Sequence, residues 1–139
     1  MSLNARSYLF DAGALFLFYS GDSRTKLYFD RVFTNRASGF VSEINLAELY
    51  YKTIEKFGMQ TAETWYKQIR QSNLNVIAPD ERITRNAALW KSKTRDVSLA
   101  DCYALATTQE KAQVLVTTDP VLAQVKGIKV AHIRVGQEK

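Results

Sequence analysis

Short apolar runs alternate with longer amphipathic segments along the whole chain, and this alternation constrains the fold more than any other feature. The apolar runs predict β-strands and the amphipathic segments predict helices. The expected strands cover residues 7–10, 39–41, 74–78, 114–117 and 128–131. The expected helices cover residues 12–19, 25–35, 45–57, 61–71, 80–94, 99–110 and 120–125. Strands that alternate with helices predict an α/β fold, in which helices cover both faces of a small parallel sheet.

Length and composition narrow the class of protein further. A chain of 139 residues predicts one domain, covering residues 1–139. Apolar residues make up 46% and charged residues 24%, which excludes wholesale disorder, a collagen-like repeat and a disulfide scaffold. The longest apolar run, residues 12–19, is too short to cross a bilayer, and no signal-peptide pattern precedes it. The single cysteine, Cys102, fits a reducing compartment, so we expect a cytoplasmic protein without membrane contact.

Four acidic residues occur where a parallel sheet usually binds its ligand. Ligands of open parallel sheets lie beyond the carboxyl ends of the strands. Asp11 follows the first expected strand, and Asp119 follows the fourth. Glu48 lies in the helix that follows the second strand, and Asp101 is the only charge in the nearly apolar segment 98–106. The α/β layout therefore places at least Asp11 and Asp119 at the same edge of the sheet.

Each of these acids also has a purely structural interpretation. Asp11 and Asp119 fit helix N-caps, and the spacings Ser98 to Asp101 and Asn45 to Glu48 resemble capping boxes. A capping carboxylate still keeps a lone pair for a metal ion, and a charge in an apolar helix requires a partner.

Carboxylates that lie close together raise one another's pKa, and a hard divalent ion such as Mg²⁺ or Mn²⁺ relieves this repulsion. Such an ion activates water and stabilises the charge on a phosphate under attack. An acidic pocket has no means of binding a polyanion without the metal. The set therefore predicts metal-assisted hydrolysis of a phosphodiester.

Four sequence blocks resemble the PIN-domain family of ribonucleases, particularly the VapC-type toxins of VapBC toxin–antitoxin systems. The blocks are YLFD at 8–11, SEINLAEL at 42–49, SLADCYALA at 98–106 and LVTTD at 115–119. The resemblance implies a strand order like 3-2-1-4-5 and a metal-dependent endoribonuclease that acts on RNA. It implies that Mg²⁺ or Mn²⁺ is held by Asp11, Glu48, Asp101 and Asp119, and that the Thr117 hydroxyl orients an acid or a water. It also implies an antitoxin partner and a homodimer.

One departure from this pattern keeps other functions open. Gly13 stands two residues after the first acid, where the family commonly has Asn or Ser. A non-catalytic PIN-like module that binds RNA or a protein is therefore the main alternative, and a small phosphatase on a similar sheet is a third hypothesis. The chain has no phosphate-binding glycine loop, no serine-hydrolase motif and no cysteine–histidine set for zinc.

Basic and aromatic residues indicate partners. The net charge of +5 weakly favours an anionic partner, and Lys91, Lys93 and Arg95 before the Asp101 helix are the candidate RNA-binding residues. We expect most of the aromatic side chains of the first two helices to lie in the core. The remainder could form a groove for an antitoxin segment or a second subunit. This aromatic set is Phe16, Phe18, Tyr19, Tyr28, Phe29 and Phe33.

Overall fold

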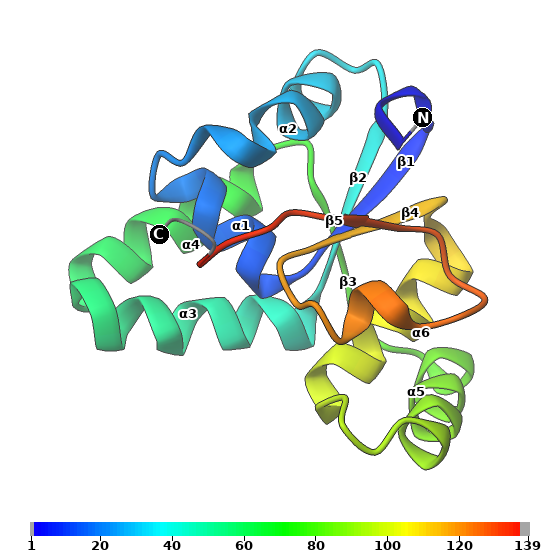
Figure 1. The fold of residues 1–139 in the computed structure, drawn as a ribbon. Coiled ribbons are helices and arrows are strands. Elements are labelled where there is room, and N and C mark those ends of the chain that lie inside the picture. The colour runs from blue at the N-terminus through cyan, green and yellow to red at the C-terminus, as the bar shows by residue number, and fades with distance from the viewer. Residues whose placement is uncertain (1, 137–139) are drawn as a thin grey trace.

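A five-stranded parallel sheet forms the centre of the molecule (Figure 1). The computed structural model describes residues 2–136. The strands are β1 (Ser7–Phe10), β2 (Ser38–Ser42), β3 (Asn75–Ile77), β4 (Val114–Thr117) and β5 (Val130–His132). Their order is β3-β2-β1-β4-β5, and every neighbouring pair is parallel. The predicted fold class and strand order are confirmed.

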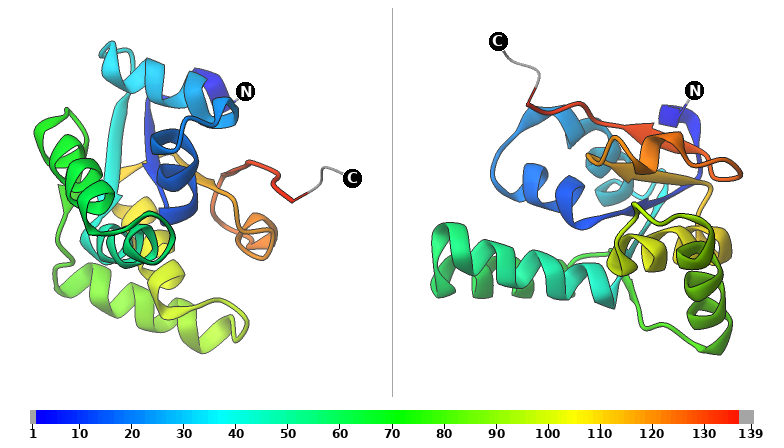
Figure 2. Two further views of the ribbon diagram at one scale, coloured as in Figure 1. Left: turned by 90° about the vertical axis from the view of Figure 1, so that its left-hand side faces the viewer. Right: turned by 60° about the horizontal axis from the view of Figure 1, so that its bottom comes forward.

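Helices cover both faces of this sheet (Figure 2). They are α1 (Ala12–Tyr19), α2 (Lys26–Phe33), α3 (Glu43–Phe57), α4 (Met59–Gln71), α5 (Glu81–Lys93) and α6 (Leu99–Lys111). Three 3₁₀ turns complete the elements: η1 (Ser2–Asn4), η2 (Ser23–Thr25) and η3 (Leu122–Gln124). Tyr8 and Phe10 of β1 pack with α1 to α4, whereas Leu9 packs with α5 and α6. Because successive strand residues face opposite sides, a fully apolar strand serves two cores at once.

Capping side chains set where the functionally important helices begin. Asp11 caps α1 by accepting the N–H of Ala14 at 2.9 Å, as expected. Ser98 caps α6 by accepting the N–H of Asp101 at 3.1 Å, also as expected. The expected cap at Asn45 is wrong, because Ser42 caps α3 and the helix begins two residues earlier, at Glu43. Asn45 thereby becomes an interior helical residue, and its side chain is buried.

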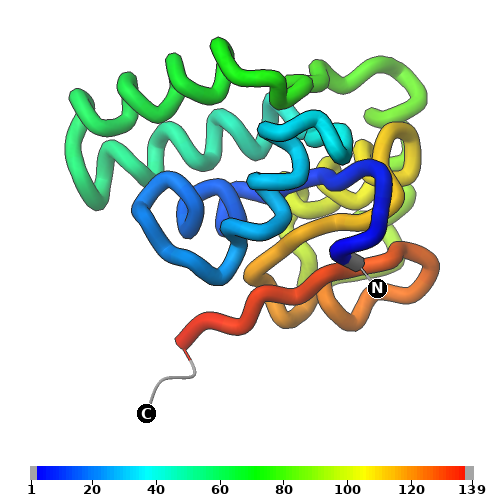
Figure 3. Tube along the Cα trace, turned by 90° about the horizontal axis from the view of Figure 1, so that it is seen from above, coloured from blue at the N-terminus to red at the C-terminus, as the bar shows by residue number. Residues whose placement is uncertain are grey.

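Other bounds differ modestly from the expected ones. The predicted helix at 120–125 is the short turn η3, and β5 begins at Val130 rather than at residue 128. Gly58, with φ of 95°, separates α3 from α4, so these two helices form a hairpin (Figure 3). A residue without a Cβ adopts this left-handed conformation readily. The hairpin presents Glu48 from its first helix toward the sheet edge described below.

Aromatic side chains of α1 and α2 fill much of one core, as predicted. Phe29 is fully buried, and it stacks on Phe10 and Phe18 with ring centroids 4.0 and 4.2 Å apart. Phe16 is less buried and lies edge-on to Trp65, with centroids 5.7 Å apart. The core therefore absorbs Phe29 and leaves Phe16 near the surface.

Two features bear on the predictions of a reducing compartment and of no membrane contact: the state of Cys102 and the length of the helices. Cys102 is buried in α6 and free, with its sulfur 3.9 Å from the Thr94 hydroxyl. Within residues 2–136, no helix combines the length and the apolar character needed to cross a membrane.

Candidate functional site

Asp11 lies between β1 and α1, at the carboxyl edge of the central strand. Its side chain accepts hydrogen bonds from the Ala14 amide and from the Thr117 hydroxyl, and only 3% of the residue is exposed. Burial raises the pKa of Asp11 to about 6, with these two hydrogen bonds opposing the shift and the charges of Glu48 and Asp119 adding to it. The carboxylate is thus fixed in place, but its charge is poorly stabilised by the protein alone.

Asp101 and Asp119 meet across the same edge. Burial is the main cause that raises the pKa of Asp101 to about 7; the hydrogen bond with the Asp119 side chain and the charges of Asp11, Asp119 and Glu48 contribute further. Two carboxyl groups can share a hydrogen bond only if one of them carries a proton. Asp119 also accepts the Val121 amide at 2.8 Å, so its carboxylate is anchored by backbone as well.

Glu48 approaches the edge from α3 and makes a different set of contacts. Its carboxylate pairs with Lys52, one turn further on, at 3.1 Å. Burial by itself lowers the pKa of Lys52, but the hydrogen bond and the charge of Glu48 outweigh it, so the pKa of Lys52 is raised. The Asn45 amide nitrogen lies 3.5 Å from both the Glu48 carboxylate and the Ala100 carbonyl oxygen, and so bridges α3 and α6.

The donor set fits a hard divalent cation in its chemistry. Oxygen ligands from Asp and Glu are those that Mg²⁺ and Mn²⁺ prefer. The buried Asn45 side-chain oxygen has no hydrogen-bond partner, which is a further unsatisfied oxygen next to Glu48. As placed, however, no three His, Cys, Asp or Glu side chains in the described part of the chain converge closely enough to hold a metal ion. Like charges repel one another, and Lys52 draws the Glu48 carboxylate into an ion pair.

Two hydroxyl groups at the end of β4 reach the start of α1. The Thr117 hydroxyl donates to Asp11 and accepts the Asp119 amide at 3.0 Å, so it links two of the acids. The Thr118 hydroxyl fills the space that a side chain at Gly13 would need, since a Cβ built on Gly13 would lie 2.0 Å from its oxygen. A hydroxyl from the residue that follows β4 therefore occupies the place left by the missing side chain of α1.

A cavity of about 570 Å³ lies beside the acidic edge. Its apolar lining includes Phe16, Leu17 and Leu49, and its polar lining includes Lys52 and Thr118. Arg24 and Val135 line one wall.

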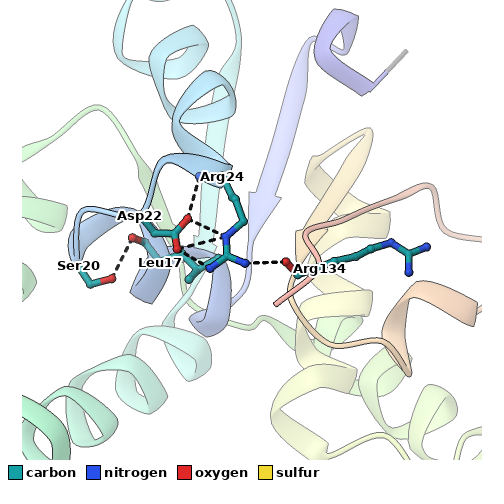
Figure 4. Close-up of polar contacts among 5 residues, drawn as sticks. All are labelled: Leu17, Ser20, Asp22, Arg24 and Arg134. Carbon is teal, nitrogen blue, oxygen red and sulfur yellow. Dashed lines mark hydrogen bonds and ion pairs between the residues drawn. The ribbon is translucent and has the colours of Figure 1, made fainter. Parts of the chain in front are cut away.

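The wall containing Arg24 joins two distant segments (Figure 4). Arg24 pairs with Asp22 at 2.6 Å and donates to the carbonyl oxygen of Arg134 at 3.0 Å. These contacts tie the turn before α2 to the segment that follows β5.

The three basic residues singled out from the sequence have different surroundings. The Lys91 ammonium donates to the carbonyl oxygens of Arg95 and Val97, at 3.3 and 2.8 Å, and so holds the loop between α5 and α6. The Lys93 ammonium lies 5.0 Å from the ring centroid of Trp90. Lys93 and Arg95 line a second cavity together with Lys126. No sequence pattern indicated Lys126, which lies about thirty residues further along the chain.

The strand order and the acids at the carboxyl ends of β1 and β4 define a parallel α/β domain with an acidic site. A model of the PIN domain family matches residues 8–128, and the chain belongs to this family. No sequence among the curated proteins matches this chain.

Several solved structures with the same fold come from toxin–antitoxin systems. A chain of a toxin–antitoxin complex from Klebsiella pneumoniae is 19% identical with a TM-score of 0.69; the match covers 92% of this chain and 99% of that one. VapBC2 from Rickettsia felis, bound to a DNA fragment from its promoter, gives 16% identity, a TM-score of 0.72 and coverages of 91% and 98%. VapC20 from Mycobacterium tuberculosis, a toxin that cleaves the sarcin–ricin loop, is 15% identical with a TM-score of 0.64. The match covers 78% of this chain and 86% of that one. At these identities the likeness establishes a shared fold.

Proposed function

We propose that this chain is a metal-dependent endoribonuclease that hydrolyses RNA phosphodiester bonds. One observation carries the proposal. Asp11 and Asp101 lie on different elements, yet they meet at one sheet edge, where burial and the neighbouring carboxylates raise the pKa of each. Perturbed carboxyl groups gathered at such an edge are typical of a catalytic centre. A divalent cation is the partner that this arrangement of charges requires.

The residues divide the work as follows. Asp11, Glu48, Asp101 and Asp119 would hold Mg²⁺ or Mn²⁺. When bound, such an ion supplies an activated water and neutralises charge on the phosphate. Thr117 keeps the Asp11 carboxylate aimed at the centre through its hydroxyl. Glu48 must leave its ion pair with Lys52 to join the other acids, and this frees the Lys52 ammonium to face a phosphate.

We also propose that the chain is the toxin of a toxin–antitoxin pair, working as a single domain and as a homodimer. The structural neighbours from such systems support the assignment as a toxin. The cavity floored by Phe16 and Leu17 offers an apolar surface next to the acids for an antitoxin segment. Co-expression with a candidate antitoxin, followed by purification of the pair, tests this part separately.

The experiment for the nuclease is cleavage of structured RNAs. We expect cleavage with Mn²⁺ or Mg²⁺, none in EDTA, and a loss of at least about a hundredfold for Asp11→Asn or Asp101→Asn. Cleavage that survives both chelation and substitution contradicts the proposal.

Two further measurements separate the alternative functions. Calorimetric titration with Mn²⁺, showing binding to the wild type but not to Asp101→Asn, counts against a non-catalytic binding module. Turnover of a generic phosphomonoester without any cleavage of RNA favours the small phosphatase instead.

A further inference from the structure

The second cavity, about 750 Å³ in volume, is a groove with excess positive charge. It lies between the α5–α6 loop and the segment that carries η3. Lys93, Arg95 and Lys126 line it and are exposed, and Asp96 is the acid among its lining residues. The side chains of Arg95 and Lys126 make no hydrogen bond or ion pair with any residue in the described range 2–136. Their charges are therefore available to a ligand.

The groove begins at the acidic edge. Pro120 and Val121 line it and directly follow Asp119, whose carboxylate accepts the Val121 amide. The opposite wall, residues 94–97, leads into Ser98, which caps the helix of Asp101. Residues of the α5–α6 loop and of the η3 segment thus face each other across one cavity. A chain molecule lying in this groove would thus pass close to Asp101 and Asp119.

The wall that carries the cations is held by its own contacts. The Lys91 ammonium fixes the carbonyl oxygens of Arg95 and Val97. Trp90 is fixed by donating to the Gln109 side chain at 2.9 Å, and its ring supports the Lys93 ammonium. A cation on an aromatic face keeps its N–H groups and its full charge, unlike one in an ion pair. The Lys93 ammonium is therefore held in position without being neutralised by an ion pair.

We propose that this groove binds the phosphates of a single-stranded RNA segment beside the bond that is cut, with Lys93, Arg95 and Lys126 as the contacts. The inference rests on the proposed ribonuclease function and adds the path of the substrate. Unpaired cations on two segments, along an open groove, match the repeated charge of a nucleic acid backbone. The acidic centre repels a polyanion, so a neighbouring basic track is needed to position the strand.

Binding of RNA without cleavage tests the groove. The probe is a fluorescently labelled single-stranded RNA, and the protein is the full chain carrying Asp101→Asn, measured by anisotropy in EDTA over a range of salt concentrations. Adding Lys93→Ala, Arg95→Ala and Lys126→Ala should weaken affinity at least about tenfold and reduce the slope of log affinity against log salt by about 2. Lys67→Ala, on the exposed side of α4, is the matched control and should change neither quantity.

The outcomes are distinct from those of the nuclease test. Unchanged affinity and slope in the triple variant overturn the groove proposal, even if the wild type cleaves RNA with metal. Loss of RNA binding in the triple variant, with an unchanged melting temperature, supports the groove even if no cleavage is ever found. If the triple variant instead binds RNA normally and loses only its affinity for an acidic polyglutamate peptide, the groove binds a protein segment and the proposal is wrong.

In a wild-type background that cleaves, Lys126→Glu should raise KM with little change in kcat, because the groove holds substrate away from the reacting atoms. Lys126→Arg should keep the wild-type KM, since the charge is retained. A fall in kcat at constant KM for Lys126→Glu contradicts the assigned role.

Discussion

Gly13 and Thr118 act as one packing unit at the residue scale. The Thr118 hydroxyl lies where a side chain at Gly13 would begin, and the Cβ of Thr118 is also close, at 3.2 Å from that point. A departure from the family pattern at Gly13 therefore has a compensating residue on another element. The hydroxyl of Thr118 also lines the cavity next to the acids, so a polar group remains at this place.

The first prediction concerns this pair. Gly13→Ala should destabilise the protein by about 1–2 kcal/mol, because overlap with Thr118 outweighs the gain in helix propensity. In Gly13→Ala with Thr118→Ala, the cost should be smaller than the sum of the two single changes. Urea unfolding of the four proteins measures this coupling. Strictly additive free energies of unfolding would show that the two side chains do not compete for space.

At the scale of elements, helix starts carry the acids into the site. Asp11 is the cap of α1, and Ser98 is the cap of α6. Asp101 is the third residue of α6, and its amide is the group that Ser98 accepts. One hydrogen bond therefore joins the capping residue Ser98 to the catalytic candidate Asp101. A role in capping is thus compatible with a role in the site.

Removing the α6 cap should affect both stability and function. Ser98→Ala should lower the free energy of unfolding by about 1 kcal/mol, because the Asp101 amide loses its acceptor. Ser98→Thr should keep nearly all of that stability, and thermal unfolding compares the two. We also expect Ser98→Ala to weaken Mn²⁺ binding in calorimetry, since the Asp101 backbone is then less firmly held. Equal stability of Ser98→Ala and the wild type contradicts the assigned cap.

At the scale of the whole molecule, charge is separated more than the net value of +5 suggests. Asp11, Glu48, Asp101 and Asp119 interact electrostatically at one edge of the sheet, and basic residues line two nearby cavities. The folded protein without metal must hold buried carboxylates close together, which opposes folding whenever they are ionised.

Stability without metal should therefore depend on pH. The pKa of Asp11 and of Asp101 rises on folding from 3.8 to about 6 and about 7, so between these values the folded state binds more protons than the unfolded state. The free energy of unfolding should fall as pH rises from about 4 to about 7. At pH 8, Asp11→Asn should be more stable than the wild type by on the order of 2 kcal/mol. Chemical unfolding in EDTA at several pH values measures this, and a wild-type stability that rises over that interval contradicts it.

Adding metal should reverse the dependence. Saturating Mn²⁺ should raise the melting temperature more at pH 8 than at pH 5, because protons compete with the metal for the same carboxylates. Asp101→Asn should lose most of this increase, whereas Glu55→Gln, which changes an acid outside the proposed ligand set, should keep it. An equal increase in all three proteins would indicate nonspecific binding.

The sequence by itself determined the architecture of this protein and the identity of the four acids. Apolar runs that are buried on both faces encode a parallel sheet locally, and acids placed after strands are bound to reach its carboxyl edge. Chain order places Asp11 and Asp119 directly after strands, whereas the candidates Glu48 and Asp101 also depend on the resemblance to the family motifs.

Only the tertiary structure decided which groups share a neighbourhood. The exchange between Gly13 and Thr118, the pairing of Glu48 with Lys52 and the groove that joins Lys126 to Lys93 and Arg95 depend on packing. Lys91 shows most clearly what sequence cannot predict. Its position before the Asp101 helix predicted RNA binding, but its ammonium donates to a carbonyl oxygen of the α5–α6 loop. Local sequence encodes the secondary structure of each segment, but distances between residues far apart in the chain are fixed only when the two cores close around the sheet.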